Sequence, residues 1–552
     1  MKHTFPLALS LLLLHPAVSV AQYRSEAWCP DNGDGTYTNP VLNADYSDPD
    51  VCANPAGTDF YLTASSFNCT PGLPILHSRD LVNWEIVGHA LPKLTPDYVF
   101  RKAAHGKGVW APCIRHHDGM YYIYWGDPDR GIYMVKAADP AGKWSEPHLV
   151  VKGKGMIDPT PLWDDDGRCY LANAWAGSRI GFKSILSVRE LSADGTTAIS
   201  NPVIVFDGNN ANRTVEGPKF YKRDGYYWIL APAGGVPTGW QLAMRAKSPY
   251  GPYECKTVMA QGSTNVNGPH QGGLVTTAQG EEWFLHFQDK GPYGRVVHLQ
   301  PVNWVDGWPV IGIDSDKDLC GEPVATFRKP KVGASIAIQN PAESDEFNAP
   351  ELGLQWQWPA NYDDSFGQPT PYGFFRLYTR KLSPKFTNLW EAPNMLLQKT
   401  PADAFTATAK VRFAAKREGQ YAGLIMMGMD YSALVVKRVG EKFRLQLITC
   451  TKADKGNAET VSDIAELEPS AADPIDYEPA IYSDLYLRLK VEKGARLSFA
   501  YSTDGKKFHS VGAGLPMREG KWIGAKFGFL AEEPAGKSPS GFLDIDWIRV
   551  TK

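Results

Sequence analysis

Three acidic residues in the first half of the chain each lie at the start of an apolar segment. Carboxylates at such positions could take part in acid–base chemistry. Glu216 lies in Val215-Glu216-Gly217-Pro218, whose apolar continuation ends in an Arg-Asp-Gly turn and resumes as a second apolar run. That pattern is typical of a two-stranded hairpin with a glutamate at its mouth. Asp48 and Asp158 each precede a proline at the start of a similar segment. Carboxylates that converge from separate strands can serve as general acid and general base.

A repeated pattern indicates that these residues converge. Turn residues followed by paired aromatic or apolar residues occur five times, about 50 to 60 residues apart, which fits four-stranded propeller blades with long loops. Each copy follows another predicted strand start, and these starts contain Asp48, Trp110, Asp158, Glu216 and His270. Because the first strand of each blade lines the central axis of a propeller, the sequence predicts that all five residues surround one funnel.

The composition favours an exported, β-rich protein. The 552 residues are 12% aromatic and include 52 glycines and 42 prolines, and the chain is too long for one ordinary domain. The formal net charge is -3 and no basic stripe is present, which argues against nucleic acid as a partner. Residues 1–21 combine a basic start, a short apolar run and small residues, so they are predicted to be a signal peptide cleaved after Ala21. No later segment is apolar for long enough to span a membrane, and a periplasmic or extracellular location is expected.

The aromatic repeat stops near residue 315, and a second β-rich region follows a linker. Residues 22–330 are predicted to form a five-bladed β-propeller, and residues 331–552 a β-sandwich of the jelly-roll type. The second region contains alternating runs at 405–413 and 485–491, and neither half shows a strong helix pattern. The eight cysteines form no CxxC pair, so they are expected to be free rather than metal-bound or disulfide-bonded.

These motifs resemble glycoside hydrolase family 43. The stretch from Asn39 to Val51, the segment Gly108-Val109-Trp110-Ala111-Pro112, and the segments around Asp158 and Glu216 are similar to that family's opening, second-blade and two further acidic motifs, in order and spacing. The resemblance covers residues 36 to 312, and the region after the linker resembles the concanavalin-A-like sandwich that many members append. It implies a five-bladed propeller and an inverting mechanism.

The resemblance also implies a role for each acid. Asp48 would be the general base, Glu216 the general acid, and Asp158 the residue that orients the acid and tunes its pKa. Asp50, two residues after Asp48, is a rival candidate for the base. Inversion places acid and base about 6.5 to 9.5 Å apart, on opposite faces of the sugar. Because Glu216 must be protonated to act, burial and the Asp158 charge are expected to raise its pKa.

Four further side chains are candidates for contact with the sugar. Trp110 and Phe67 are candidates for stacking on its apolar face, and the alternative for each is a place in the blade core. His270 is either a buried core histidine or a group that reaches the base or a central ion. By resemblance, Arg295 would bind sugar hydroxyls or the pair of acids.

No metal or cofactor is required by this reading. Asp345 and Asp546 could share a structural calcium in the sandwich, as similar domains sometimes do. The acidic stretch 164–167 is interpreted as a solvated hairpin turn, because the spacing of a calcium-binding loop is absent.

The resemblance implies an exo-acting, inverting glycosidase that releases terminal L-arabinofuranose from plant cell-wall polysaccharide side chains, an α-L-arabinofuranosidase. A β-xylosidase, or an enzyme with both activities, is the alternative, because the two pentoses present similar hydroxyl arrangements. A non-catalytic carbohydrate-binding propeller is a hypothesis from another class, and the three carboxylates disfavour it. A retaining enzyme of the invertase type is disfavoured because the motifs of that group are missing. The expected partner is a plant cell-wall oligo- or polysaccharide, and the sequence does not indicate an oligomeric state.

Overall fold

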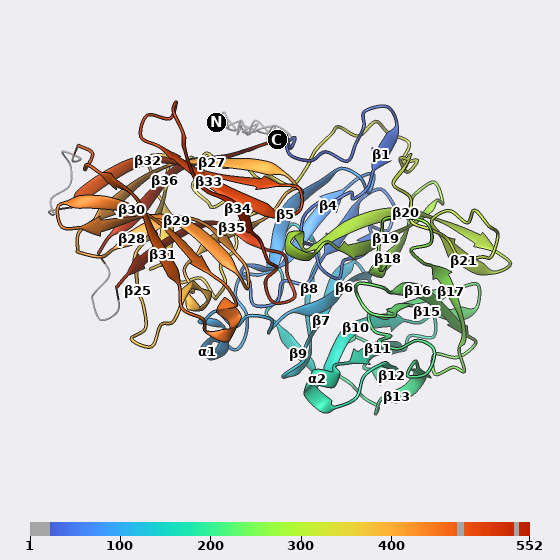
Figure 1. The fold of residues 1–552 in the computed structure, drawn as a ribbon. Coiled ribbons are helices and arrows are strands. Elements are labelled where there is room, and N and C mark those ends of the chain that lie inside the picture. The colour runs from blue at the N-terminus through green and yellow to red at the C-terminus, as the bar shows by residue number, and fades with distance from the viewer. Residues whose placement is uncertain (1–22, 472–479, 535–539) are drawn as a thin grey trace, which may run out of the picture.

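The computed structural model describes residues 23–471, 480–534 and 540–552, and the predicted signal peptide lies outside these ranges. Strands dominate and form two bodies that lie side by side (Figure 1). The predicted all-β fold, a five-bladed propeller followed by a sandwich, is confirmed. No helix in the described ranges is long and apolar enough to cross a bilayer. The helical elements are short: α1 (Asp97–Phe100), α2 (Gly177–Ile180), η1 (Gly291–Tyr293), η2 (Leu389–Glu391) and η3 (Ala453–Lys455).

Each propeller blade is a four-stranded antiparallel sheet whose strands follow chain order. Blade 1 contains β2 (Asp50–Ala53), β3 (Phe60–Thr63), β4 (Gly72–Ser78) and β5 (Trp84–Leu91). Blade 2 contains β6 (Trp110–His117), β7 (Met120–Asp127), β8 (Gly131–Ala137) and β9 (His148–Lys152). Blade 3 contains β10 (Met156–Trp163), β11 (Cys169–Trp175), β12 (Ile185–Leu191) and β13 (Val203–Asp207). Blade 4 contains β14 (Lys219–Arg223), β15 (Tyr226–Ala233), β16 (Trp240–Ala246) and β17 (Glu254–Met259). Blade 5 contains β18 (His270–Thr276), β19 (Glu282–Asp289), β20 (Arg295–Val305) and β21 (Trp308–Ile311).

The N-terminal segment closes the ring. Leu42 exchanges two backbone hydrogen bonds with Val297 of β20, at 3.2 and 2.9 Å, and so adds a pairing partner to blade 5. Nearby, β1 (Thr36–Thr38) pairs with β22 (Thr326–Arg328), the strand that follows the last blade. Segments from both ends of the propeller are therefore hydrogen-bonded together.

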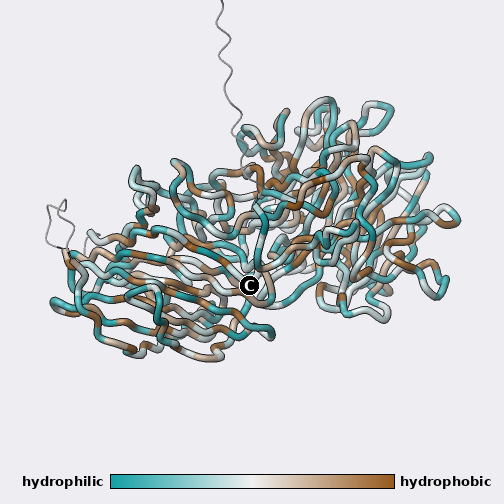
Figure 2. Tube along the Cα trace, turned by 90° about the horizontal axis from the view of Figure 1, so that it is seen from above, coloured by the Kyte–Doolittle hydropathy of each residue, from teal (hydrophilic) through white to brown (hydrophobic). Residues whose placement is uncertain are grey.

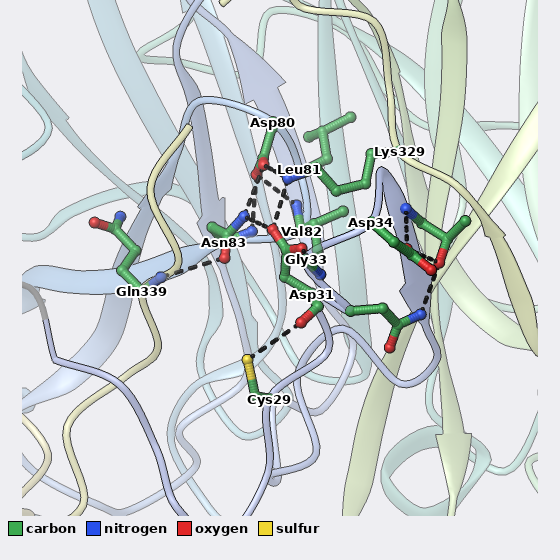
Figure 3. Close-up of polar contacts among 12 residues, drawn as sticks. Cys29, Asp31, Gly33, Asp34, Asp80, Leu81, Val82, Asn83, Lys329 and Gln339 are labelled. Carbon is green, nitrogen blue, oxygen red and sulfur yellow. Dashed lines mark hydrogen bonds and ion pairs between the residues drawn. The ribbon is translucent and has the colours of Figure 1, made fainter. Parts of the chain in front are cut away.

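A buried polar network strengthens this closure (Figure 3). Asn83 Nδ2 donates to Asp31 Oδ2 at 2.7 Å and to Asp80 Oδ2 at 2.8 Å. The ammonium of Lys329 lies 2.6 Å from Asp31 Oδ2 and 3.2 Å from Asp80 Oδ2. The backbone N–H of Gln339 donates to Asn83 Oδ1. The N-terminal segment, a loop of blade 1 and the linker after the propeller thus share one set of contacts.

The second body consists of two facing sheets. The first contains β23 (Gly367–Pro369), β24 (Phe375–Tyr378), β36 (Phe542–Thr551), β27 (Phe405–Ala415), β32 (Ile481–Glu492), β33 (Arg496–Ser502) and β34 (His509–Pro516). The second contains β25 (Arg380–Lys381), β26 (Leu396–Lys399), β35 (Lys526–Glu533), β28 (Tyr421–Met427), β29 (Tyr431–Val439), β30 (Lys442–Cys450) and β31 (Thr460–Leu467). Alternate residues of β27, including Val411 and Phe413, enter the core between the sheets, as the period-2 pattern predicted. Figure 2 shows hydrophilic residues along the outer loops of both bodies.

Several minor expectations can be compared with this fold. All eight cysteines are free. Residues 164–167 form the turn between β10 and β11, although Asp164 is paired with Lys222 and Tyr227 of blade 4 rather than solvated. Asp345 accepts a hydrogen bond from the Trp356 indole at 2.8 Å, whereas Asp546 lies 2.5 Å from the Lys410 ammonium. Each of the two aspartates proposed to share a calcium therefore has protein partners of its own.

Candidate active site

The innermost strand of every blade starts at a backbone kink. One residue in each start has a positive φ, a conformation that is uncommon for residues other than glycine. These residues are Asp48 (53°), Ala111 (29°), Asp158 (56°), Gly217 (58°) and Gln271 (41°). The pairing register shifts at this place in blades 2, 3 and 5. Irregularities of this kind re-aim side chains, and here they recur around one axis.

The kinks correct the sequence-based alignment of the blades. Asp48 and Asp158 occupy the kink itself, whereas Trp110, Glu216 and His270 come one residue before it. In a regular strand, neighbouring residues face opposite sides of the sheet. Because the kink interrupts that alternation, residues at both positions reach one site, as their contacts demonstrate.

Asp48 is held through both carboxylate oxygens. Arg295 Nη1 donates to Oδ1 over 3.0 Å, and Ser65 Oγ donates to Oδ2 over 2.6 Å. Ser65 Oγ accepts the backbone N–H of Ala111 at 2.7 Å, which directs the hydroxyl hydrogen toward Asp48. Residues from blades 1, 2 and 5 therefore fix the orientation of this carboxylate, and each of its oxygens accepts a hydrogen bond.

Asp50, the rival candidate for the base, has different partners. Its Oδ2 accepts hydrogen bonds from Arg115 Nη1 at 2.6 Å and from the backbone N–H of Ile114 at 2.9 Å. The side chain is completely buried. Both partners belong to β6, so Asp50 joins blade 1 to blade 2. A carboxylate committed to this buried ion pair is poorly suited to activate water, which favours Asp48 as the base.

Asp158 and Glu216 meet between blades 3 and 4. The backbone N–H of Gly217 donates to Asp158 Oδ2 over 2.8 Å, which fixes Asp158 next to Glu216. A Cβ at Gly217 would stand 2.3 Å from the side chain of Gln271, and the positive φ also favours glycine here. His270 Nε2 lies 3.5 Å from Glu216 Oε1. Three blades therefore define the surroundings of Glu216.

These surroundings shift the pKa values of Glu216, Asp158 and His270. Burial, together with the charges of Asp158 and Asp48, raises the pKa of Glu216 to about 8. Burial and the Asp48 charge also raise the pKa of Asp158, against the hydrogen bond from Gly217. Glu216 keeps 36% of its side chain exposed, so its proton remains accessible to a ligand. Burial lowers the pKa of His270 to about 3, so this histidine is neutral beside Glu216.

Aromatic side chains from both domains surround the site. Trp110 makes an edge contact with Phe67, at 6.0 Å between ring centres, and with Trp522, at 6.1 Å. Phe67 is only 2% exposed, so it supports Trp110 from behind rather than offering an open face to a sugar. Trp522 is 47% exposed and comes from the loop between β34 and β35 of the sandwich. The sandwich therefore lends a loop to the propeller.

Three residues of the site were not identified from the sequence. Ser65 follows β3 and carries no motif, so only its contact with Asp48 reveals it. Gln271 is followed by Gly272, whereas the equivalent residues of the other four blades are followed by proline, and that recurring proline is the signal that marks the kink position in the sequence. Trp522 belongs to the other domain, and no local pattern could connect it to Trp110.

The arrangement around the axis suits acid–base chemistry by carboxyl groups. Among the described residues, the one group of three acidic side chains close enough to hold an ion is Asp314, Asp316 and Asp318. That group lies on the loop after β21 and shares no residue with the site. Around the axis lie an ion-paired carboxylate (Asp48), a carboxyl group with a raised pKa (Glu216) and a third acid beside it (Asp158).

Comparison with known proteins agrees with this arrangement. A putative beta-xylosidase from Xylanibacter ruminicola is 36% identical over 501 residues, which cover 91% of this chain and 87% of the relative. A beta-xylosidase from Formosa agariphila is 32% identical over 581 residues, covering 97% and 93%. A non-reducing end alpha-L-arabinofuranosidase from Bacteroides ovatus is 33% identical over 445 residues, covering 76% and 79%.

Similarity to solved structures and family models extends over both domains. The crystal structure of a GH43 protein from Bacillus licheniformis has a TM-score of 0.76 and 25% identity, and covers 94% of this chain and 99% of its own. The model described as glycosyl hydrolases family 43 matches residues 37–309, and the model described as beta xylosidase C-terminal concanavalin A-like domain matches residues 344–551. The protein is a glycoside hydrolase, which sets aside the non-catalytic alternative. These matches show that the chain belongs to glycosyl hydrolase family 43.

Proposed function

We propose that the protein is an exo-acting, inverting β-xylosidase that removes terminal D-xylopyranose from fragments of plant cell-wall xylan. The observation that carries the inverting mechanism is that the carboxyl groups around the propeller axis have different environments. Asp48 is ion-paired with Arg295 at 3.0 Å, whereas the pKa of Glu216 is raised to about 8. An inverting glycosidase needs one ionised and one protonated carboxyl group, which act from opposite faces of the sugar.

In this proposal, the three acids have separate roles. Asp48 accepts a proton from the attacking water while Arg295 and Ser65 hold its oxygens in place. Glu216 donates its proton to the leaving oxygen, and the exposed third of its side chain provides the access. Asp158 orients the acid through Gly217 and raises its pKa by charge. The neutral His270 lies 3.5 Å from Glu216 Oε1 through its Nε2 atom.

Trp110 and Trp522 are the proposed sugar-binding surfaces. Trp522 is about half exposed and its ring lies edge-on to Trp110 across the domain boundary. Partly exposed indole rings present an apolar face that matches the C–H groups of a pyranose. A loop from a second domain at the rim of the axis favours a short site for a chain end over an open groove for internal binding.

The choice of xylose over arabinose rests on relatives rather than on geometry. The relatives named putative beta-xylosidase (Xylanibacter ruminicola) and beta-xylosidase (Formosa agariphila) cover more of the chain than the arabinofuranosidase does. This reverses the order expected from the sequence alone. The α-L-arabinofuranosidase activity remains the second candidate, because the relative with that name is 33% identical. Export through the segment 1–21 is part of the proposal, since polymeric xylan is found outside cells.

The test is hydrolysis of nitrophenyl β-D-xylopyranoside and nitrophenyl α-L-arabinofuranoside by wild type, Glu216→Ala and a control, Asp166→Ala, in the exposed turn of blade 3. We expect xyloside turnover by the wild type and the control, and we expect hydrolysis of xylobiose, whose leaving group needs a proton from the acid, to be lost only in Glu216→Ala. Arabinoside turnover alone would make the second candidate the function. NMR of the first product should show α-xylose from a β-xyloside, and initial release of β-xylose would contradict inversion.

A further inference from the structure

The outer face of the first sandwich sheet has two open pockets, and no propeller residue lines either of them. Thr406, Thr408, Lys410 and Arg412 of β27 alternate with core residues and therefore face away from the second sheet. The two threonines line the larger pocket, of about 680 Å³, and the lysine and arginine line the smaller one, of about 630 Å³. Figure 1 shows β27, β32 and β36 close together in this sheet. The pockets thus follow one another along β27, over about 20 Å from Thr406 to Arg412.

Aromatic rings border both pockets. Trp547 of β36 and Tyr486 of β32 are the pairing partners of Lys410 on either side of β27. Their ring centres are 6.1 Å apart, less than the roughly 9.6 Å that separates two strands with one between them, so the rings lean toward each other over β27. Phe508 lines the larger pocket, and Tyr372, which is 76% exposed, lines the smaller one. Aromatic faces of this kind match the C–H groups of pyranose rings.

The smaller pocket is electrically balanced. Each of its three cations has a carboxylate nearby: Arg376 is 2.7 Å from Asp544, Lys410 is 2.5 Å from Asp546, and Arg412 is 3.6 Å from Asp484. A charged ligand would have to compete with these ion pairs. An uncharged ligand with many hydroxyl groups could instead hydrogen-bond to them as they stand.

The larger pocket has more positive than negative charge. Its charged lining residues are Arg488, Lys506, Arg549 and Asp504. Asp504 accepts a hydrogen bond from the backbone N–H of Lys506 at 2.8 Å, as part of its own turn. Arg549 is paired at 2.8 Å with Glu346, which lies outside the pocket. Arg488 is the cation that these carboxylates leave without a partner.

Arg488 is half-buried and is held in place by uncharged groups. Its Nε donates to Thr408 Oγ1 at 3.0 Å, and its guanidinium lies 3.6 Å from the centre of the Phe508 ring. Its Nη groups make no hydrogen bond within the described ranges. Partial burial lowers the pKa of Arg488, and no acid among the described residues opposes that shift. A positioned guanidinium with free N–H groups is the donor that binds a carboxylate through two parallel hydrogen bonds.

We propose that this face binds a xylan chain that has uronic acid side groups. Backbone pyranose rings stack on Trp547 and Tyr486, and Arg488 binds the carboxylate of a uronic acid in the larger pocket. The uncharged backbone continues across the balanced smaller pocket toward Tyr372. The choice of xylan rests on the proposed function, whereas the binding itself requires no hydrolysis. Such a site would hold the enzyme on the polysaccharide whose chain ends the propeller degrades.

The experiment measures retardation of the full-length protein in native gels that contain a soluble polysaccharide, relative to a gel without one. Because chain ends are scarce in a polymer, retardation reports binding to internal segments. Glucuronoxylan has both the xylose backbone and the uronic acid, arabinoxylan has the backbone without the acid, and polygalacturonate has the acid without the backbone. We expect the tightest binding to glucuronoxylan, binding at least threefold weaker to arabinoxylan, and no retardation by polygalacturonate.

Three variants test the contacts. Trp547→Ala should weaken binding to both xylans at least tenfold, because the stacking surface is lost. Arg488→Met should remove the preference for glucuronoxylan over arabinoxylan. Arg444→Met, which changes the same charge on β30 of the other sheet, is the matched control and should bind as the wild type does.

The outcomes separate the alternatives. Absence of retardation of the wild type by glucuronoxylan would overturn the proposal, and equal retardation by polygalacturonate would refute recognition of the xylan chain. Unchanged binding by Trp547→Ala would refute the stacking surface. If that variant does not fold, an unchanged preference in Arg488→Met would still refute the carboxylate contact. Turnover of nitrophenyl β-D-xylopyranoside by the same preparations tests the proposed function separately: retardation without turnover supports this site and contradicts the proposed function, and turnover without retardation does the reverse.

Discussion

The substitution Asp158→Asn tests whether the Asp158 charge helps to keep Glu216, the proposed acid, protonated. Burial is the largest cause of the raised pKa of Glu216, and the charge of Asp158 is the next. The basic limb of kcat/KM against pH reports this acid in the free enzyme. Without the Asp158 charge, we expect that limb to move to lower pH by about 1 pH unit, the scale on which two carboxyl groups in one site interact. Above the limb, this corresponds to about a tenfold loss of activity.

The same substitution should stabilise the fold at neutral and alkaline pH. Burial raises the pKa of Asp158 from 3.8 in the unfolded chain to about 7 in the folded protein. Between these values the folded state binds a proton that the unfolded state has lost, so stability falls as pH rises, and the penalty is complete above pH 7. Asparagine carries no such charge. The melting temperature of the variant should therefore exceed that of the wild type above pH 7, and the two should converge as pH falls below 4.

The assay is hydrolysis of xylobiose across a pH range that brackets 8, because an unactivated leaving group requires a proton from the acid. Asp166→Asn, an exposed turn residue in the same blade, is the matched control and should keep the wild-type profile. A basic limb that stays in place in Asp158→Asn, or moves to higher pH, would refute the view that the Asp158 charge raises the pKa of Glu216. A lower melting temperature above pH 7 would count against the stability argument.

Three further substitutions test other contacts. Glu216→Gln should lower kcat for xylobiose by about 10²- to 10⁴-fold, and far less for a nitrophenyl xyloside whose leaving group needs no proton; equal losses on both substrates would argue that Glu216 is not the acid. Trp522→Ala should raise KM more than it lowers kcat, as expected of a binding surface, and a change in kcat alone in steady-state assays would contradict that role. Asp50→Asn breaks a buried ion pair with Arg115 and should lower the free energy of unfolding by about 3 to 5 kcal/mol, measured by denaturant titration. Both pH limbs should stay in place in Asp50→Asn, and a moved acidic limb would restore Asp50 as a candidate base.

The propeller was predictable because its cause is local and repeated. Each blade has an aromatic second strand, and side chains such as Tyr124, Trp228 and Trp283 must be buried between neighbouring sheets. Burial of a large aromatic or aliphatic side chain contributes about 1.5 to 3 kcal/mol to stability. Each blade therefore contains such residues, and they recur in the sequence at a regular spacing. The sandwich was predictable for a similar reason, since β27 and β32 alternate between core and surface over most of their length.

The fine geometry of the site was not predictable, because it depends on contacts between distant segments. The kinks at Asp48 and Asp158 shift the register by one residue relative to Glu216, a change that hydrophobic patterns do not record. Asp50 could be separated from Asp48 only once its ion pair with blade 2 was seen. Trp522 reaches the site through a domain contact that no periodicity in the sequence could reveal.

The different roles proposed for two equivalent aspartates originate outside the strand starts. Asp48 and Asp158 occupy the same kink position, each before a proline, with φ values of 53° and 56°. Arg295 of blade 5 contributes a guanidinium 3.0 Å from Asp48, while Asp158 receives an uncharged backbone N–H from blade 4. The nearby Lys219 ammonium donates to the Pro112 carbonyl instead of to Asp158. The ion pair with Arg295 therefore distinguishes Asp48, the proposed base, from Asp158, whereas motifs at the strand starts alone would treat the two as equal.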